Sequence, residues 1–172
     1  INVALRTKDA YWKGVVDNFS KEQAGEVNVW LQNGAKWQHE AASRTNGMDA
    51  ANMPNYSRPN YGLYDHVSYI HHFYGGTSAD KTGYLTQNHE SQIHIDNYSG
   101  YSTVIYQHNG SGMEKSDYIG GDTTIVHAAT GSNITLATGN NGVDVNDSNA
   151  VAKVLNALAS KLIYSNYVNG ES

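Results

Sequence analysis

The chain has 172 residues and carries 11 Lys+Arg against 16 Asp+Glu, a formal charge of −5. Because nucleic acid and anionic membranes both attract a positive surface, this balance disfavours them as partners. Cysteine is absent, which excludes a disulfide scaffold and thiolate metal sites. No run of about 18 apolar residues occurs, so we expect no membrane contact by this segment. The length suits one domain, residues 1–172. Since Ile1 begins directly in strand-like sequence without a signal peptide, we expect an excised or processed piece.

A strand-like segment at the start of the chain recurs after a short interval. Residues 2–5, followed by Trp12, resemble residues 28–31, followed by Trp37. The offset in numbering is 31 − 5 = 26 at the leucines and 37 − 12 = 25 at the tryptophans. Apolar side chains alternate in both copies, which is typical of strands with one buried face. Residues 13–27 hold a capping-box pattern, so we expect a short helix or a loop there.

The segment from about residue 43 to 66 interrupts the strand pattern. It holds both prolines, Pro54 and Pro59. Because proline cannot donate to a strand ladder, we expect a loop insertion outside the sheets. Loops on a rigid scaffold often carry function, and tyrosine can stack and hydrogen-bond with little loss of rotamer freedom. The sequence therefore predicts a glycan or protein contact patch at these residues: Tyr56, Arg58, Tyr61, Tyr64, His66 and Tyr69. The alternative is that these tyrosines only cover the side of the scaffold.

A second pair of matching segments lies further along the chain. Residues 102–105, with Gly-Ser at 110–111, align without a gap on residues 123–126, with Gly-Ser at 131–132. The offset in numbering is 123 − 102 = 21. A strand-and-turn unit that repeats every 20–30 residues or so is typical of a solenoid. We therefore expect successive turns of chain to stack in parallel, with Val104 directly over Ile125 in a common interior.

Five Asn-Gly pairs, at 33–34, 46–47, 109–110, 141–142 and 169–170, punctuate the strands. Each can form a hairpin turn, so an antiparallel sandwich is an alternative fold. Two observations favour a parallel arrangement: the repeat interval exceeds that of simple hairpins, and hydroxyl residues recur at matching positions. The sequence therefore predicts an all-β fold, a parallel β-helix (solenoid).

One helix is expected near the end of the chain, from about residue 147 to 164. Asp147 or Ser148 can cap its start. We expect this amphipathic C-terminal helix to pack on the β-helix through an apolar stripe. The stripe follows helical spacing and consists of Val151, Val154, Leu155, Leu158, Leu162 and Ile163.

These segments resemble a known family. Residues 121–129, 131–136 and 140–142, the helix at 154–162 and the strand pair at 29–37 are similar to passenger repeats of large Gram-negative autotransporter adhesins. The likeness covers most of residues 1–42 and 80–170 and is lost over the insertion. It implies a right-handed β-helix, a secreted stalk exported through a separate C-terminal membrane barrel, and a role in adhesion or aggregation. Under this resemblance we expect the chain to be an internal fragment of the passenger.

Eight histidines raise the question of a metal site. His66, His71, His72, His89 and His94 can supply imidazoles to zinc or copper. No pair has the His-Glu-x-x-His spacing, however, and regular alternation would put residues 71 and 72 on opposite faces of a strand. We therefore expect no metal site and no cofactor.

A calcium loop is the second metal candidate. Asp144, Asn146 and Asp147 resemble part of one, but the glycine and the distant glutamate of the full pattern are missing. A turn that leads into the helix cap explains the same residues more simply.

The sequence offers little for catalysis. No serine lies in a Gly-x-Ser-x-Gly elbow, and the acidic residues are dispersed along the chain. Polysaccharide lyases and glycoside hydrolases also use parallel β-helices, so a carbohydrate-active enzyme fragment is the main alternative. The sequence predicts a non-catalytic adhesin segment on the bacterial cell surface, in contact with host or bacterial glycans or proteins. Self-association and a purely structural stalk are further alternatives.

Overall fold

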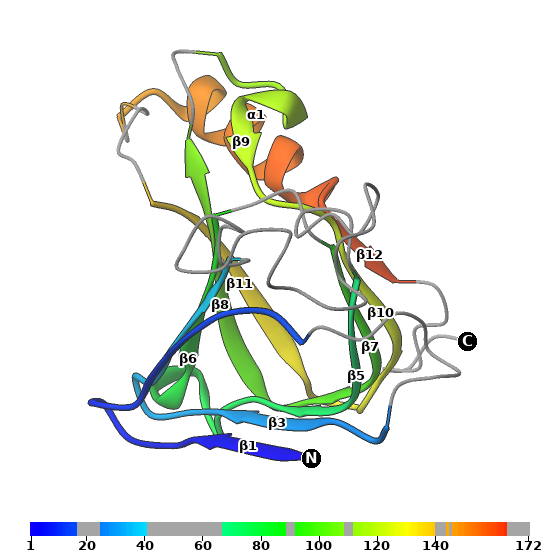
Figure 1. Ribbon diagram of the computed structural model, residues 1–172. Helices are drawn as coiled ribbons and strands as arrows, with labels where there is room; N and C mark the ends of the chain where they lie inside the picture. The colour runs from blue at the N-terminus through cyan, green and yellow to red at the C-terminus, as the bar shows by residue number, and fades with distance from the viewer. Residues whose placement is uncertain are drawn as a thin grey trace, which may run out of the picture.

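A computed structural model describes residues 1–16, 25–40, 67–88, 92–108, 112–139, 144 and 146–164. These residues form two mainly parallel sheets and one α-helix (Figure 1). Sheet A consists, in spatial order, of β1 (Asn2–Leu5), β3 (Asn28–Leu31), β5 (Val67–Tyr74), β7 (Gln92–Ser99), β10 (Thr123–Ala128) and β12 (Leu162–Tyr164). Sheet B consists of β11 (Asn133–Thr138), β8 (Tyr101–His108), β6 (Gly83–Gln87), β4 (Lys36–His39) and β2 (Tyr11–Lys13), and β9 (Tyr118–Ile119) pairs antiparallel with β8. The helices are α1 (Ser148–Ala159) and the 3₁₀ turns η2 (Ala79–Lys81) and η3 (Lys115–Asp117).

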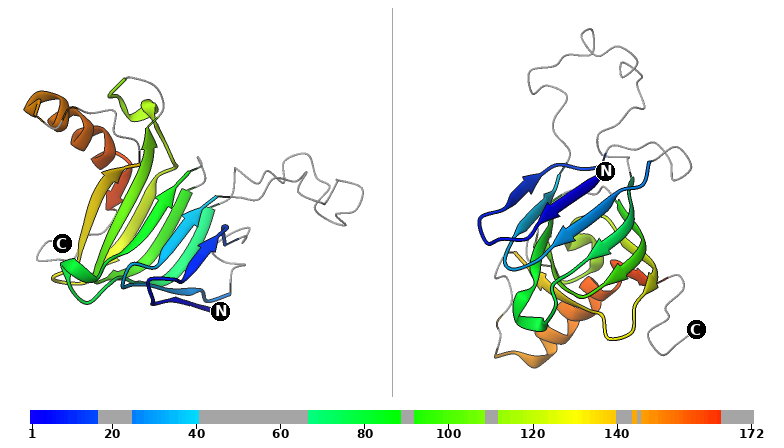
Figure 2. Two further views of the ribbon diagram at one scale, coloured as in Figure 1. Left: turned by 90° about the vertical axis from the view of Figure 1, so that its left-hand side faces the viewer. Right: turned by 90° about the horizontal axis from the view of Figure 1, so that it is seen from below.

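The chain passes back and forth between the two sheets. β1 and β2, β3 and β4, β5 and β6, β7 and β8, and β10 and β11 form successive strand pairs, with the first strand in sheet A and the second in sheet B. Each new pair adds to both sheets in parallel with the pair before it. Figure 2 shows the strands side by side along the molecule, from the N-terminus toward α1 at the other end. The all-β class and the parallel pairing agree with the prediction from sequence, and the antiparallel sandwich is wrong for these strands.

The core lies between the two sheets. In β3 and β6 alternate residues point inward: Val29 and Leu31 are fully buried in β3, and Leu85 is buried in β6. Each fully buried aliphatic side chain contributes about 1.5–3 kcal/mol through loss of apolar surface from water. The turn between β7 and β8 is Gly100 alone, whose φ of 89° lets the chain leave sheet A and enter sheet B within one residue.

The first sequence repeat is confirmed in register. Leu5 pairs with Leu31 in sheet A, and Trp12 pairs with Trp37 in sheet B. The two segments are therefore equivalent strand pairs stacked on each other.

The stacking predicted from the second sequence repeat is wrong. Val104 pairs with Leu85 and Leu136 in sheet B, whereas Ile125 pairs with Ile95 in sheet A. The alignment of the two segments therefore superposed a strand of one sheet on a strand of the other. Both sheets bury one face and select the same alternation of apolar and hydroxyl residues, which is why the two segments look alike. Val104 and Ile125 do share one core, from opposite walls.

In three neighbouring strands of sheet A, regular alternation of buried and outward-facing residues is interrupted at matching positions. Inward-facing residues are separated by three positions at Ile70 and Phe73, at 95 and 98, and at 125 and 128. In β5 the amides of His71 and His72 both donate to the carbonyl of Val27, at 2.7 and 3.4 Å. As in a β-bulge, two successive residues then lie on the same face. The expectation that His71 and His72 lie on opposite faces is therefore wrong: neither is buried, and their ring centroids are 4.6 Å apart.

The predicted helix is present but ends earlier than expected. α1 begins after Asp147, whose side chain accepts hydrogen bonds from the amides of Asn149 and Ala150. Its buried face is formed by Ala150, Val154, Ala157 and Leu158, while Leu155 is exposed. Residues 162–164 form β12 instead of a last helical turn, because they pair with residues 123–125 of sheet A.

The insertion predicted at 43–66, with Pro54 and Pro59, lies outside the described residues, as does most of the helix or loop expected at 13–27. Within the described part of the chain, no helix combines the length and hydrophobicity that crossing a membrane would require.

Candidate functional site

Among the residues that the structure describes, one pocket lies on the outer face of sheet B, and we call it the sheet B pocket. Its floor comes from outward-facing residues of three adjacent strands: Lys36 of β4, Tyr84 and Thr86 of β6, and Ile105 of β8. In β6 these alternate with buried Gly83, Leu85 and Gln87, so the same pattern that fills the core also exposes the pocket floor.

Turns that connect sheet A to sheet B form the wall of the pocket. Asn33 and Gly34 have φ of 55° and 82°, as the sequence predicts for an Asn-Gly turn. Their amides donate to the carbonyls of Lys81 and Thr82 at 2.9 Å, and the Asn33 side chain donates to the carbonyl of Arg6 at 3.0 Å. Three consecutive turns are thus tied together by hydrogen bonds, so the pocket is built on a connected framework.

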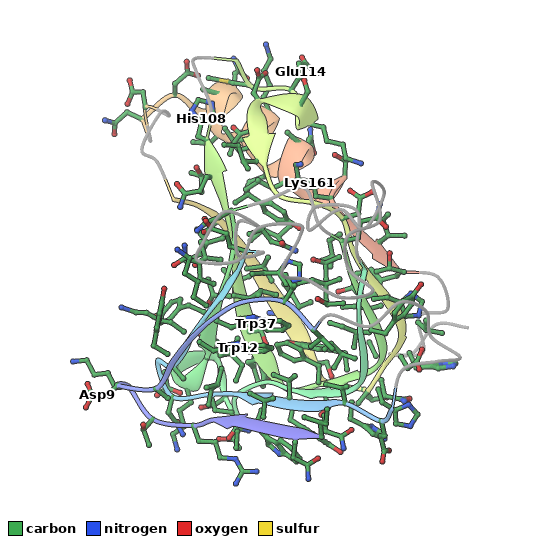
Figure 3. All side chains as sticks on the ribbon, viewed as in Figure 1. Asp9, Trp12, Trp37, His108, Glu114 and Lys161 are labelled. Atoms are coloured by element: carbon green, nitrogen blue, oxygen red, sulfur yellow. The ribbon has the colours of Figure 1, made fainter. Side chains whose placement is uncertain are left out.

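The pocket presents both hydrogen-bond donors and acceptors. It has a volume of about 740 Å³, within the range of small-ligand sites. Its lining residues are Lys8, Asp9, Asn33, Gly34, Lys36, Asp80, Thr82, Tyr84, Thr86 and Ile105. Figure 3 shows Asp9 at the tip of the connection between β1 and β2, pointing away from the core. A sugar or a polar peptide can engage these groups: two ammonium groups, two carboxylates, an amide, hydroxyls and one tyrosine ring.

Asp80 is an acceptor at this site. A hydrogen bond from Ser78 Oγ, at 2.5 Å, together with its own backbone amide and the charge of Lys81, lowers the pKa of the Asp80 carboxyl. Glycoside hydrolysis needs a carboxylic acid whose pKa is raised, so that it can protonate the leaving oxygen. The environment of Asp80 instead lowers the pKa of its carboxyl, which does not suit the role of that acid.

Only one of the six ligand-contact residues predicted from sequence falls in the described part of the chain. Tyr56, Arg58, Tyr61, Tyr64 and His66 lie outside it. Tyr69 lies on β5, half-buried on the outer face of sheet A, with its ring centroid 5.4 Å from that of His94. It does not line the sheet B pocket.

Aromatic side chains also form a row on the outer face of sheet A. The ring of Trp30 stacks on that of Tyr74 at 4.7 Å, and the guanidinium of Arg6 lies 4.9 Å from the Trp30 ring. His72 continues the row, 5.7 Å from Tyr74. Because Trp30 is covered on both sides by protein groups, we interpret this row as stabilising cross-strand packing and not as a platform for a sugar ring.

A serine–histidine pair lies inside the core. His39 Nε2 is 2.8 Å from Ser68 Oγ, and His39 Nδ1 is 3.1 Å from Gln87 Oε1. The arrangement has the connectivity of a catalytic triad, but all three residues have 0% of their surface exposed. Ser68 Oγ also accepts a hydrogen bond from the amide of Val16 at 3.1 Å. A substrate cannot reach this serine, so we interpret the group as a structural network.

The core network continues toward α1. Gln87 Nε2 donates to Thr123 Oγ1 at 3.0 Å, and Thr123 faces the phenol of Tyr106 at 3.5 Å. Lys161 Nζ donates to the carbonyl of Gly120 at 2.6 Å and lies 5.5 Å from the Tyr106 ring. Figure 3 shows Lys161 below α1. A second cavity, of about 570 Å³, borders Lys161 and η3, but its lysines already bind the protein: Lys115 pairs with Asp122 at 3.1 Å.

The calcium candidates have structural roles here. Asp144 Oδ1 accepts a hydrogen bond from the amide of Asn146 at 2.9 Å, and Asp147 caps α1. The turn interpretation therefore accounts for Asp144 and Asp147.

Comparison of the chain with protein-family models, with curated proteins and with solved structures gives no match in any of the three. The resemblance to autotransporter passengers therefore stays a prediction from sequence.

Proposed function

We propose that the chain is a segment of right-handed parallel β-helix from a bacterial surface adhesin, and that it acts by binding without catalysis. The fold proposal is supported by the alternation of strands between sheets A and B and by their parallel register. Right-handedness follows the general rule for crossovers between parallel strands of one sheet. Location at the cell surface and the adhesin family rest on the sequence resemblance.

The sheet B pocket carries the functional proposal. Its polar groups come from consecutive turns and strands held in register, so a ligand would meet an ordered array of donors and acceptors. Tyr84, with 37% of its surface exposed, adds an aromatic face beside Lys36, its register partner. This combination suits a glycan, whose hydroxyls both donate and accept hydrogen bonds and whose ring carbons pack on aromatic groups.

Two observations argue against particular catalytic roles. The lowered pKa of the Asp80 carboxyl disfavours Asp80 as a general acid, and Ser68 is too deeply buried to act as a nucleophile on a substrate. A carbohydrate-active enzyme and a passive stalk are the competing functions, and a glycan array together with an assay for released sugar separates them.

The test is a glycan array probed with the full chain and with two tyrosine variants. We expect wild type to bind a defined set of glycans and Tyr84→Ala to lose at least tenfold in affinity. Tyr11→Ala is the matched control, because Tyr11 is also exposed on sheet B, at 56%, but does not line the pocket. Binding by the control should equal that of wild type.

Other results would redirect the proposal. Absence of any glycan hit favours a stalk, or a protein ligand. Loss of binding in a Tyr61→Ala, Tyr64→Ala double variant, with Tyr84→Ala unaffected, places the contact on the insertion. Release of reducing sugar or of unsaturated product from a bound polysaccharide would show an enzyme.

A further inference from the structure

We propose that Glu26, His71 and His72 form a surface site for a divalent transition metal, best suited to Zn²⁺. Each of the three side chains offers a ligand atom, and these atoms all lie within 4.8 Å of one another. The site lies on the outer face of sheet A, away from the sheet B pocket, and does not depend on the function proposed for that pocket.

The break in strand alternation creates the site. The shared hydrogen bonds to the Val27 carbonyl bring two successive histidines to one face, where a regular strand would separate them. The residue that precedes Val27 is Glu26, and its Oε1 lies 3.4 Å from His71 Nε2. One backbone contact between β5 and the start of β3 therefore places all three ligands together.

The chemistry of the three groups fits zinc. Zinc binds imidazole nitrogen at about 2.0–2.1 Å and carboxylate oxygen at about 2.0–2.2 Å in tetrahedral geometry. Those bond lengths require ligand atoms roughly 3.3 Å apart, which the side chains can reach by rotation because Glu26 and His71 are 61% and 45% exposed. A set of two histidines and one carboxylate leaves a fourth position for water or for a group from a partner.

Neighbouring groups orient the ligands. Asp96 Oδ2 lies 3.5 Å from His71 Nδ1, whereas Glu26 faces the other ring nitrogen, Nε2. A carboxylate at one imidazole nitrogen fixes the proton there and leaves the other nitrogen free to bind metal. The side chain of Asn97 donates to the carbonyl of His71 at 3.1 Å, and the ring of His72 stacks on Tyr74. The alternative is that His71 only forms exposed ion pairs with Glu26 and Asp96.

Isothermal titration of the untagged full chain with zinc chloride tests the proposal. We expect one zinc ion per chain in wild type, and at least tenfold weaker binding in Glu26→Gln, His71→Ala and His72→Ala. Asp96→Asn should weaken binding by about 10–100-fold, as loss of an orienting partner does, while the stoichiometry stays at one. Cobalt(II) absorption in the visible region should report tetrahedral coordination in wild type.

A matched control removes a histidine from the same face without touching a proposed ligand or Asp96. His127 is exposed on β10. His127→Ala should bind zinc as wild type does. The proposal is overturned if wild type does not bind zinc at all, which leaves only ion pairs, or if a His71→Ala, His72→Ala double variant keeps wild-type affinity, which locates the zinc elsewhere. None of the substituted residues is buried, and circular dichroism checks that each variant is folded.

Discussion

Trp12 and Trp37 stack with their ring centroids 4.6 Å apart and their planes only 8° from parallel. They are register partners in β2 and β4, the first two strands of sheet B. Trp37 is fully buried, and its Nε1 donates to the carbonyl of Gly14 at 2.9 Å. Figure 3 shows both indoles between the two sheets. The pair therefore ties the first strand pair to the second through the core.

Replacement of the Trp37 side chain by alanine should strongly destabilise the fold. We expect Trp37→Ala to lower the free energy of unfolding by about 3–5 kcal/mol, the range for large buried aromatic residues. Trp12→Ala should cost less, because Trp12 is half-buried. Urea unfolding curves give both values, and near-ultraviolet circular dichroism should show the same loss of indole–indole coupling in the two variants. Equal destabilisation by Trp37→Ala and by the exposed control Tyr11→Ala would contradict this packing.

The buried serine–histidine pair should affect stability. Ser68→Ala removes the acceptor for the Val16 amide and the hydroxyl that faces His39. An unsatisfied buried polar group costs about 1–3 kcal/mol, so we expect a loss of that size in urea unfolding. Ser116→Ala, at an exposed serine of η3, is the control and should change stability by less than about 0.5 kcal/mol. A Ser68→Ala variant as stable as this control would show that the network contributes nothing.

Alkaline pH should destabilise the fold through Tyr106. Burial, with a smaller contribution from the charge of Asp122, raises the pKa of this phenol to about 12, against a hydrogen bond from Thr123 that lowers it. The folded state therefore keeps the proton at a pH where the unfolded state has lost it. This stabilisation is fully present below about pH 10 and disappears as pH rises toward about 12, a total of roughly 3 kcal/mol at 1.4 kcal/mol per pKa unit.

The variant Tyr106→Phe tests the assignment. It keeps the ring and removes the titrating group, so its stability should fall less steeply than that of wild type between about pH 10 and 12. The stability of Tyr106→Phe should still fall somewhat with rising pH, because burial also raises the pKa of Tyr98. Identical pH profiles for wild type and Tyr106→Phe, measured by urea unfolding, would refute the role of Tyr106.

Asp147 should act as a helix cap and not as a calcium ligand. Asp147→Ala removes the acceptor for two amides of the first turn of α1, and loss of such a cap costs about 0.5–2 kcal/mol. Asp144→Ala is the control, because Asp144 accepts one hydrogen bond in the preceding turn and does not cap the helix. The thermal midpoint of wild type should not change on addition of millimolar calcium. A calcium-dependent rise that Asp144→Ala abolishes would restore the metal interpretation.

The sequence predicts those parts of the fold in which local pattern decides the outcome. The matched leucines and tryptophans of the first two strand pairs identify true register partners, because both segments repeat strand, turn and strand in the same order. The Asp147 cap follows in the same way from one residue beside a helical stripe.

The second repeat fails because register depends on the lengths of the connections. The offset in numbering between register partners is 31 − 5 = 26 at the leucines of β1 and β3, 72 − 28 = 44 between β3 and β5, and 125 − 95 = 30 between β7 and β10. With no constant period, the alternation of apolar residues fits strands of either sheet equally well.

Neither proposed site can be assembled from local sequence alone. The sheet B pocket joins residues as distant as Asp9, Asp80 and Ile105, which become neighbours only when the turns and strands are in register. The pairing of His71 with His72 depends on the carbonyl of Val27 in another strand. The Asn-Gly turn at 33–34 and the adjacent histidines were visible in the sequence, but their surroundings were not.

Disulfide cross-linking in this cysteine-free chain tests the register of the strands most directly. Thr103 and Thr135 are partners on β8 and β11, where neighbouring Cα atoms are close enough for a disulfide, whereas Thr124 lies on β10 in sheet A. Thr103→Cys, Thr135→Cys should oxidise to an intramolecular disulfide, and Thr103→Cys, Thr124→Cys should keep two free thiols, as counted by alkylation and mass spectrometry. Cross-linking of the second variant and not of the first would contradict the two-sheet register on which the account depends.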